Sequence, residues 1–130
     1  MNDIEKILDL MFPFVENLLI KNGEFYPFAA AMKNSGEIEQ VGIEEDDDNP
    51  ASQKVIDELK DVLVSLKSNY KAYALFYNVY HKTDEINAIA VKVEHKIEAS
   101  SFTFYYPYEL LNGELNYKDA WKTEKQMEIF

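Results

Sequence analysis

Carboxylates are the side chains with the clearest chemical potential in this sequence. Five of them follow one another without interruption: Glu44, Glu45, Asp46, Asp47 and Asp48. The run lacks the glycine and the distal glutamate that an EF-hand calcium loop places at fixed positions, so it does not match that kind of site. Asn49 and Pro50 come next and suit the cap and first position of a helix, whose positive end the run would face. We expect the run to bind a cationic partner, and the alternative is a solvated approach to a helix.

Two histidines and no cysteine limit the chemistry open to this chain. Without thiolates, a zinc site would need His81 or His95 together with carboxylates, and neither histidine has a second ligand at the spacing that metal sites use. His95 shares its strand face with Val93 and Ile97, so we expect it at the edge of the core with a satisfied hydrogen bond. No serine stands in a G-x-S-x-G sequence. We therefore assign no catalytic residue, no metal ligand and no cofactor.

Aromatic side chains are frequent, with nine tyrosines and eight phenylalanines. Strand alternation assigns Phe76, Phe102 and Phe104 to the core. Tyrosine is common at interfaces because it buries a large area at low entropic cost and keeps a polar tip. The tyrosines predicted to contact a partner, from the opposite strand face, are Tyr73, Tyr77 and Tyr105. The competing interpretation is that the C-terminal tail with Trp121 folds over that face.

Composition sets the class of protein. A chain of 130 residues with 47% hydrophobic content fits a single domain, 1–130, with its own core. The formal net charge of −11 repels nucleic-acid phosphates and anionic lipid head groups, so neither nucleic acid nor membrane is expected as a partner. The N-terminus lacks the basic region of a secretory leader, and Phe25 to Met32, the longest nearly uncharged stretch, is too short to span a membrane. We expect a cytoplasmic protein.

Apolar spacing predicts two amphipathic helices. In the first twenty residues, apolar side chains recur at steps of three and four, from Ile4 to Leu19. Pro13 removes a backbone donor there, so we expect a kink or two short helices meeting near Phe12. Gly23 provides the stop. The second helix follows Pro50, and its apolar stripe consists of Val55, Ile56, Leu59, Val62, Leu63 and Leu66.

The remaining segments predict strands. A turn at 33–36 joins two segments into a β-hairpin, and a meander of three strands follows. The predicted strands are Glu24 to Met32, Glu37 to Ile43, Tyr70 to His81, Asn87 to Ile97 and Ser101 to Tyr108. Pro27 places the first at an edge of the sheet or gives it a bulge, and the fourth alternates as a strand buried on one side. The third is apolar on both faces and is expected to be central. Leu115 and Tyr117 could form one more short strand.

The fold class is therefore α+β. We expect an antiparallel five-stranded sheet with two helices packed on it, in the order α-β-β-α-β-β-β, and a short C-terminal tail. The helices lie either together on one face or on both.

This order of elements resembles that of the roadblock and profilin-like α+β folds over roughly the whole chain, and the resemblance implies the fold without any catalytic residue. The chain also resembles small uncharacterised bacterial cytosolic proteins in three stretches: FYPFAAAM at 25–32, NAIAVKVEH at 87–95 and FYYPYEL at 104–110. That resemblance implies a bacterial cytosolic domain without an assigned activity.

Together these features predict a non-enzymatic protein-binding domain. The acidic run would steer a basic protein partner and the tyrosines would hold it. One version is an immunity or antitoxin protein that neutralises a basic nuclease toxin. Two alternatives stay open: a homodimeric structural or scaffold domain, and a metal-dependent hydrolase that uses His81 or His95 with acids of the 44–48 run.

Overall fold

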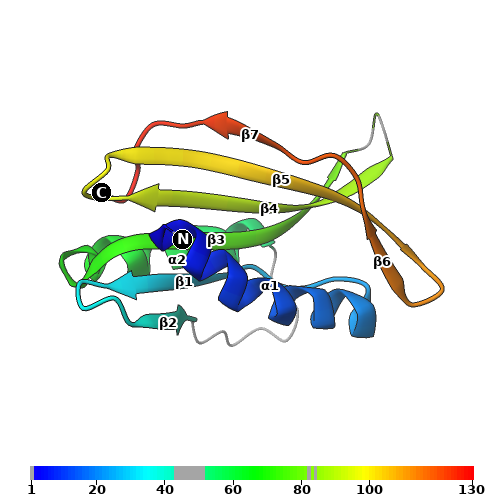
Figure 1. Cartoon of the computed structure of the whole chain (residues 1–130), viewed down its shortest axis with the longest axis horizontal. Coiled ribbons are helices and arrows are strands. Elements are labelled where there is room, and N and C mark those ends of the chain that lie inside the picture. The colour runs from blue at the N-terminus through cyan, green and yellow to red at the C-terminus, as the bar shows by residue number, and fades with distance from the viewer. Residues whose placement is uncertain (1, 43–51, 82, 84) are drawn as a thin grey trace.

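The computed structural model of the chain is an α+β domain built on one antiparallel sheet (Figure 1). It describes residues 2–42, 52–81, 83 and 85–130, with only the backbone of His81. The elements are α1 (Asp3–Asn22), β1 (Phe28–Lys33), β2 (Ile38–Val41), α2 (Ser52–Ser65), the 3-10 turn η1 (Lys67–Asn69), β3 (Tyr70–His81), β4 (Ile86–His95), β5 (Ser100–Leu111), β6 (Glu114–Tyr117) and β7 (Trp121–Glu124). Neither described helix is both long and apolar enough to cross a membrane.

The described residues form a seven-stranded sheet, so the prediction of five strands is wrong. Its strands lie in the order β2-β1-β3-β4-β5-β6, and β7 also pairs with β5. The long strand β5 accepts both partners along one edge, because Phe102–Tyr105 pair with β7 and Tyr108–Leu111 pair with β6. The predicted order of helices and strands holds as far as β5. The extra strand expected around Leu115 and Tyr117 is β6, whereas β7 replaces part of the predicted tail.

Helix α1 runs without interruption through Pro13. The prediction of two short helices meeting near Phe12 is therefore wrong. The Asn2 side chain caps its start by accepting a 2.8 Å hydrogen bond from the Glu5 amide. Gly23 ends it in the left-handed conformation, with φ of 76°. Pro13 lies on the exposed side of the helix, where water can reach the carbonyl that loses its partner. Burial of the opposite side holds the helix together.

Strand β1 is an inner strand between β2 and β3, which corrects its predicted place at an edge. Pro27 precedes the first strand residue, so its missing N–H interrupts no ladder bond. The irregularity in register lies instead at the other end, between Met32 and Lys33.

The two helices pack on opposite faces of the sheet, as Figure 1 shows. Alternation along β1 makes this division visible, since Ala30 packs with the core under α1 and Ala29 and Ala31 pack with the core under α2. All three alanines are fully buried, because covered strands are apolar on both sides. The expectation that β3 is central and covered on both faces is confirmed.

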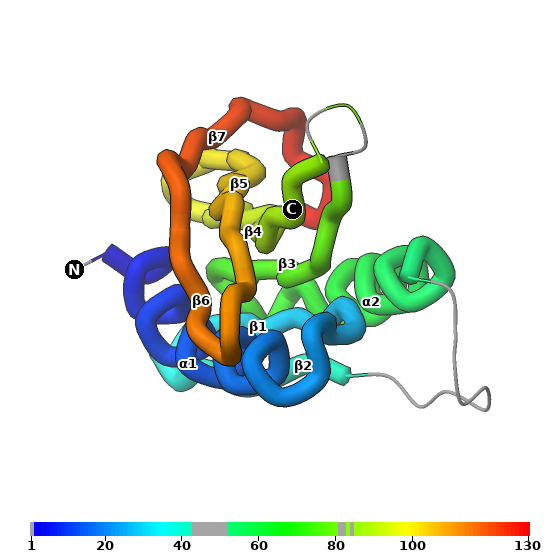
Figure 2. The backbone as a smooth tube through the Cα atoms, turned by 90° about the vertical axis from the view of Figure 1, so that its right-hand side faces the viewer, coloured from blue at the N-terminus to red at the C-terminus, as the bar shows by residue number. Residues whose placement is uncertain are grey.

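Beyond β4 the sheet curls around α1 instead of continuing flat. Figure 2 shows β6 passing beside α1, and the Tyr117 hydroxyl donates a 2.7 Å hydrogen bond to Glu16 of that helix. The curl gives the α1 side of the sheet a concave surface.

Candidate functional site

A groove of about 360 Å³ runs between α1 and the curled part of the sheet. Its lining residues come from one side of the first half of α1 and from two strands: Glu5, Leu8, Asp9, Phe12, Tyr106 and Tyr117. The four helical members form two i, i+4 pairs, Glu5 with Asp9 and Leu8 with Phe12, so they lie on one face of the helix. We call this surface the concave groove.

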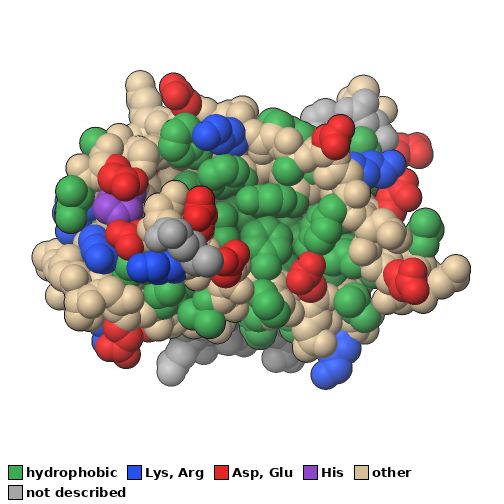
Figure 3. Space-filling view, viewed as in Figure 1, with side chains coloured by type: hydrophobic (Ala, Val, Ile, Leu, Met, Phe, Trp, Pro, Cys, Tyr) green, Lys and Arg blue, Asp and Glu red, His purple; other side chains and the backbone are tan. Residues whose placement is uncertain are grey.

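An aromatic row continues the groove along β5. Phe102, Phe104 and Tyr106 occupy alternate positions and point to the same side, with neighbouring ring centroids 6.2 and 6.3 Å apart. Phe12 of α1 meets Tyr106 edge to face at 4.9 Å. All three β5 rings are only partly buried, so the prediction of a core position for Phe102 and Phe104 holds in part: both pack against the core under α1 and stay partly exposed. In Figure 3, hydrophobic side chains gather at the centre of this face, with acidic side chains around them.

The charges around the groove favour a cationic ligand. Glu5 and Asp9 are exposed carboxylates on its helical wall. On β7, the Lys122 ammonium lies 4.6 Å from the centre of the Phe102 ring, so one end of the aromatic row already holds a cation within the chain. Burial raises the pKa of Tyr106, and burial together with the bond to Glu16 raises that of Tyr117. Both hydroxyls therefore stay neutral at physiological pH.

The three predicted contact tyrosines do not form one exposed surface. Tyr73 is fully buried against α2 and the C-terminal segment, so its prediction as a partner contact is wrong. Tyr77 is half-buried beside the same core, and Tyr105 is half-buried with Trp121 stacked on it at 5.1 Å. The competing interpretation holds in part, because the last two residues of the tail cover the face around Tyr73, whereas Trp121 lies in β7 beside β5 and is 50% exposed. A contact role for Tyr77 or Tyr105 stays a prediction.

A buried carboxylate explains why the tail docks there. Glu94 is fully buried, and its side chain accepts hydrogen bonds from the backbone N–H groups of Glu128, Ile129 and Phe130 at 3.2 to 3.3 Å. The Tyr73 hydroxyl donates to it as well, and burial with this bond raises the pKa of that tyrosine. The Glu94 carboxylate thus ties the C-terminal segment, residues 125–130, to β4.

The fourth predicted strand was expected to be buried on one side only, which would leave Lys92 and Glu94 exposed on the other, and this expectation is wrong because both are buried. The Lys92 ammonium lies 3.8 Å from a Glu94 oxygen and 3.5 Å from one of Glu128, so the buried charges are paired. In the sequence, the sign that the tail docks on the sheet was its apolar last pair, Ile129 and Phe130, after a polar stretch.

His95 holds the start of α1 against the end of β4, which confirms its expected place at the core edge with a satisfied hydrogen bond. Its Nε2 lies 2.8 Å from an Asp3 oxygen, and its Nδ1 accepts the Glu98 amide at 3.2 Å. A nitrogen that accepts carries no proton, so Nε2–H donates to Asp3 and neither nitrogen is open to a substrate.

The other predicted site residues lie outside the described part of the chain. These are the acidic run, Glu44, Glu45, Asp46, Asp47 and Asp48, together with the side chain of His81. Within residues 2–42, 52–80, 83 and 85–130, no three His, Asp or Glu side chains gather where they could hold a metal ion.

No protein-family model, no curated protein and no solved structure matches this chain.

Proposed function

We propose that the protein binds a basic protein partner in the concave groove. The observation that carries this proposal is the partly exposed aromatic row of β5, which lies beside two exposed carboxylates of α1. A lysine- or arginine-rich segment would place its aliphatic stems on the rings and its charges near Glu5 and Asp9.

The charge of the whole chain supports the same partner. A net charge of −11 attracts a basic protein from a distance, whereas the aromatic row provides the short-range contact area. In this proposal the acidic run at 44–48 adds to the steering. An immunity or antitoxin role, in which the protein covers the substrate groove of a basic nuclease, is the specific form that we propose.

The test is affinity purification from native cells with two matched charge-reversal variants. Glu5→Lys with Asp9→Lys alters the groove, and Glu109→Lys with Glu114→Lys makes the same charge change at the exposed β5–β6 end. Wild type and the β5–β6 variant should enrich the same basic protein at about 50 mM salt and lose much of it at about 200 mM, because salt screens exposed charges. The groove variant should fail to enrich that protein at either concentration.

Retention of the partner by the groove variant would overturn this site. If all three proteins are recovered alone, sizing chromatography decides between a monomer and the homodimeric scaffold. A dimer that the groove variant disrupts would assign the groove to a second copy instead of a basic partner.

A further inference from the structure

Strand β2 forms an open edge of the sheet. It pairs with β1 on one side, and no further described strand pairs with its other side (Figure 1). In an antiparallel pair, residues whose N–H and C=O groups point to the partner strand alternate with residues whose groups point away. The Lys33 amide donates to the Glu37 carbonyl at 2.7 Å, and in the register of β1 and β2 this makes Ile38 and Gln40 residues of the second kind. Each directs one N–H and one C=O to the side where a further strand would pair.

The α2 side of this edge is acidic. Alternate residues of a strand face opposite sides of the sheet, and Glu39 faces the α2 side together with Glu37 from the turn. Both carboxylates lie near the Lys33 ammonium, at 3.9 Å for Glu37 and 3.3 Å for Glu39, and their side chains are 69% and 39% exposed. The hydrogen bond from Tyr70 lowers the pKa of Glu39, so this carboxylate is charged at neutral pH. Two carboxylates beside one ammonium favour a further cation.

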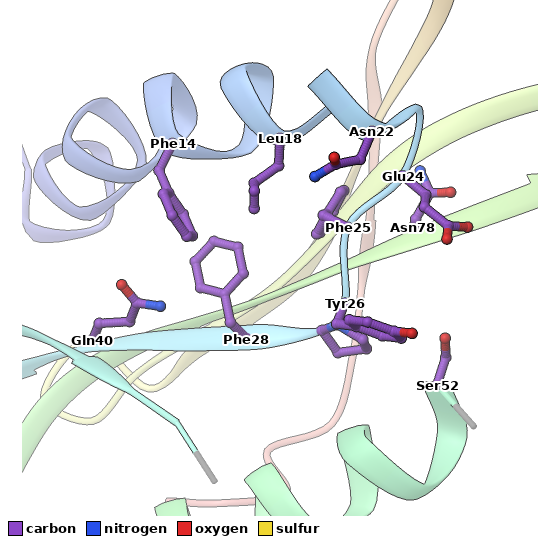
Figure 4. A pocket seen from close by; sticks show the side chains of 11 residues that line it. Phe14, Leu18, Asn22, Glu24, Phe25, Tyr26, Phe28, Gln40, Ser52 and Asn78 are labelled. Carbon is purple, nitrogen blue, oxygen red and sulfur yellow. The ribbon is translucent and has the colours of Figure 1, made fainter. Parts of the chain in front are cut away.

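The α1 side of the same edge is mostly apolar. Ile38 packs against the core under α1 and stays partly exposed. Gln40 lines a hollow together with Phe14 of α1 and Phe28 of β1. Figure 4 shows Gln40 and Phe14 extending toward each other across this hollow, and Phe14 is 39% exposed. An apolar side chain placed beside Ile38 and Gln40 on this face would add to that apolar surface.

We propose that the edge of β2 binds an extended segment of another protein as an added antiparallel strand, in which basic residues alternate with apolar ones. Hydrogen bonds to the main chain of Ile38 and Gln40 would provide affinity, and the two unlike faces would select the alternation. The basic residues would lie on the α2 side beside Glu37 and Glu39. The apolar residues would lie on the α1 side beside Ile38.

A second copy of this chain does not suit the same edge. A twofold pair in which Ile38 of each copy bonds to Gln40 of the other is centred on Glu39. It would place the two Glu39 carboxylates opposite one another, and like charges directly opposite destabilise a strand pair. The net charge of −11 on each copy adds to this repulsion. The edge is also separate from the concave groove, because β2 and β6 lie at opposite ends of the strand order.

The experiment is an NMR titration of the whole wild-type chain with the peptide Lys-Val-Lys-Val-Lys, blocked at both ends, followed by amide hydrogen exchange. Saturating peptide should slow exchange of the Ile38 and Gln40 amides, because they gain hydrogen-bond partners. Exchange of the Glu39 amide, which already faces β1, should not change. No binding, or binding without slower exchange at Ile38 and Gln40, would overturn the proposal.

Two methylated peptides of equal charge separate main-chain pairing from simple charge attraction. In the antiparallel arrangement the valines lie opposite Ile38 and Gln40, so their N–H groups point to β2 and those of the lysines point away. N-methylation of both valines should therefore weaken binding at least about tenfold, whereas N-methylation of two lysines should weaken it less than about twofold. Equal affinities of the two methylated peptides, or the reverse order, would contradict the proposed pairing.

Matched variants locate the charge contribution. Glu37→Lys should weaken binding of the unmethylated peptide several-fold, and Glu124→Lys makes the same charge change on β7, where it should have a much smaller effect. The Glu5→Lys, Asp9→Lys variant should keep the slowed exchange at Ile38 and Gln40, so failure of the groove proposal is distinguishable from failure of this one. Peptide-induced shifts confined to the groove residues would overturn the edge site.

Discussion

Glu94 shows how one buried carboxylate can organise a segment far away in the sequence. It accepts bonds from three consecutive backbone amides of the C-terminal segment and from the Tyr73 hydroxyl, and it lies 3.8 Å from the Lys92 ammonium. A buried charge is costly unless it is paired and hydrogen-bonded, and here both conditions are met. The same contacts mean that removing the charge leaves several groups without a partner.

We predict that Glu94→Gln lowers the free energy of unfolding by about 2–4 kcal/mol, because it leaves Lys92 without its closest buried partner and weakens several charge-assisted bonds. Urea unfolding followed by circular dichroism measures this. Glu109→Gln is the matched control, since Glu109 pairs with Lys118 at 2.8 Å but both side chains are 50% exposed, and it should cost less than about 1 kcal/mol. Equal effects of the two substitutions would show that the Glu94 contacts contribute little.

At the scale of elements, the C-terminal segment acts as a cover for one face of the sheet. Ile129 is 3% exposed and belongs to the core under α2. The Phe130 ring meets Tyr73 edge to face at 5.7 Å, and the Lys96 ammonium lies 5.0 Å from its centre. Without these contacts, part of the apolar sheet face under α2 and the Glu94 carboxylate within it would be exposed to water.

We predict that Ile129→Ala destabilises the protein by about 2–5 kcal/mol through lost burial and a residual cavity. Ile97→Ala is the control, because Ile97 is 78% exposed and its truncation should change stability by less than about 0.5 kcal/mol. Differential scanning calorimetry of both variants makes the comparison. Similar melting temperatures for the two would mean that the C-terminal segment does not pack on the sheet in solution.

The elements that sequence periodicity predicted well are those with a strong local signal. The stripe of α1 and the alternation of β3 to β5 depend on residues close together in the chain, and His95 followed from that alternation. Strand β7 was missed because its four residues, from Trp121 to Glu124, are mostly polar and become a strand only when β5 offers its edge.

The candidate site was harder to predict than the elements. Strand alternation assigned Phe102 and Phe104 to the core, but their partial exposure depends on how far the sheet curls around α1. Glu5 and Asp9 carried no local sign of lying beside those rings. Tyr73 was misassigned for the same reason, since part of its burial comes from Ile129 and Phe130, more than fifty positions away.

At the scale of the whole molecule, the excess negative charge and a few stabilised carboxylates have opposite effects on stability as the pH falls. The net charge of −11 at pH 7 produces repulsion that weakens as pH falls toward the isoelectric point near 4.5. The hydrogen bond from His95 lowers the pKa of Asp3 below its ordinary value of 3.8, and the hydrogen bond from Tyr70 lowers that of Glu39. Such carboxylates stabilise the fold above their unfolded pKa, and this contribution is lost as pH falls through the folded value.

We therefore predict that stability rises from pH 7 to about pH 5 and falls below about pH 4, where Asp3 and Glu39 take up protons. Urea midpoints in buffers of equal ionic strength measure this profile. High salt should flatten the rise between pH 7 and 5, because screening already removes the repulsion. The Asp3→Asn variant should still become more stable from pH 7 to about pH 5. Its stability should then fall less steeply below about pH 4, because asparagine does not take up a proton there. A steady decline from pH 7 downward would show that charge repulsion is not what limits the stability of this protein.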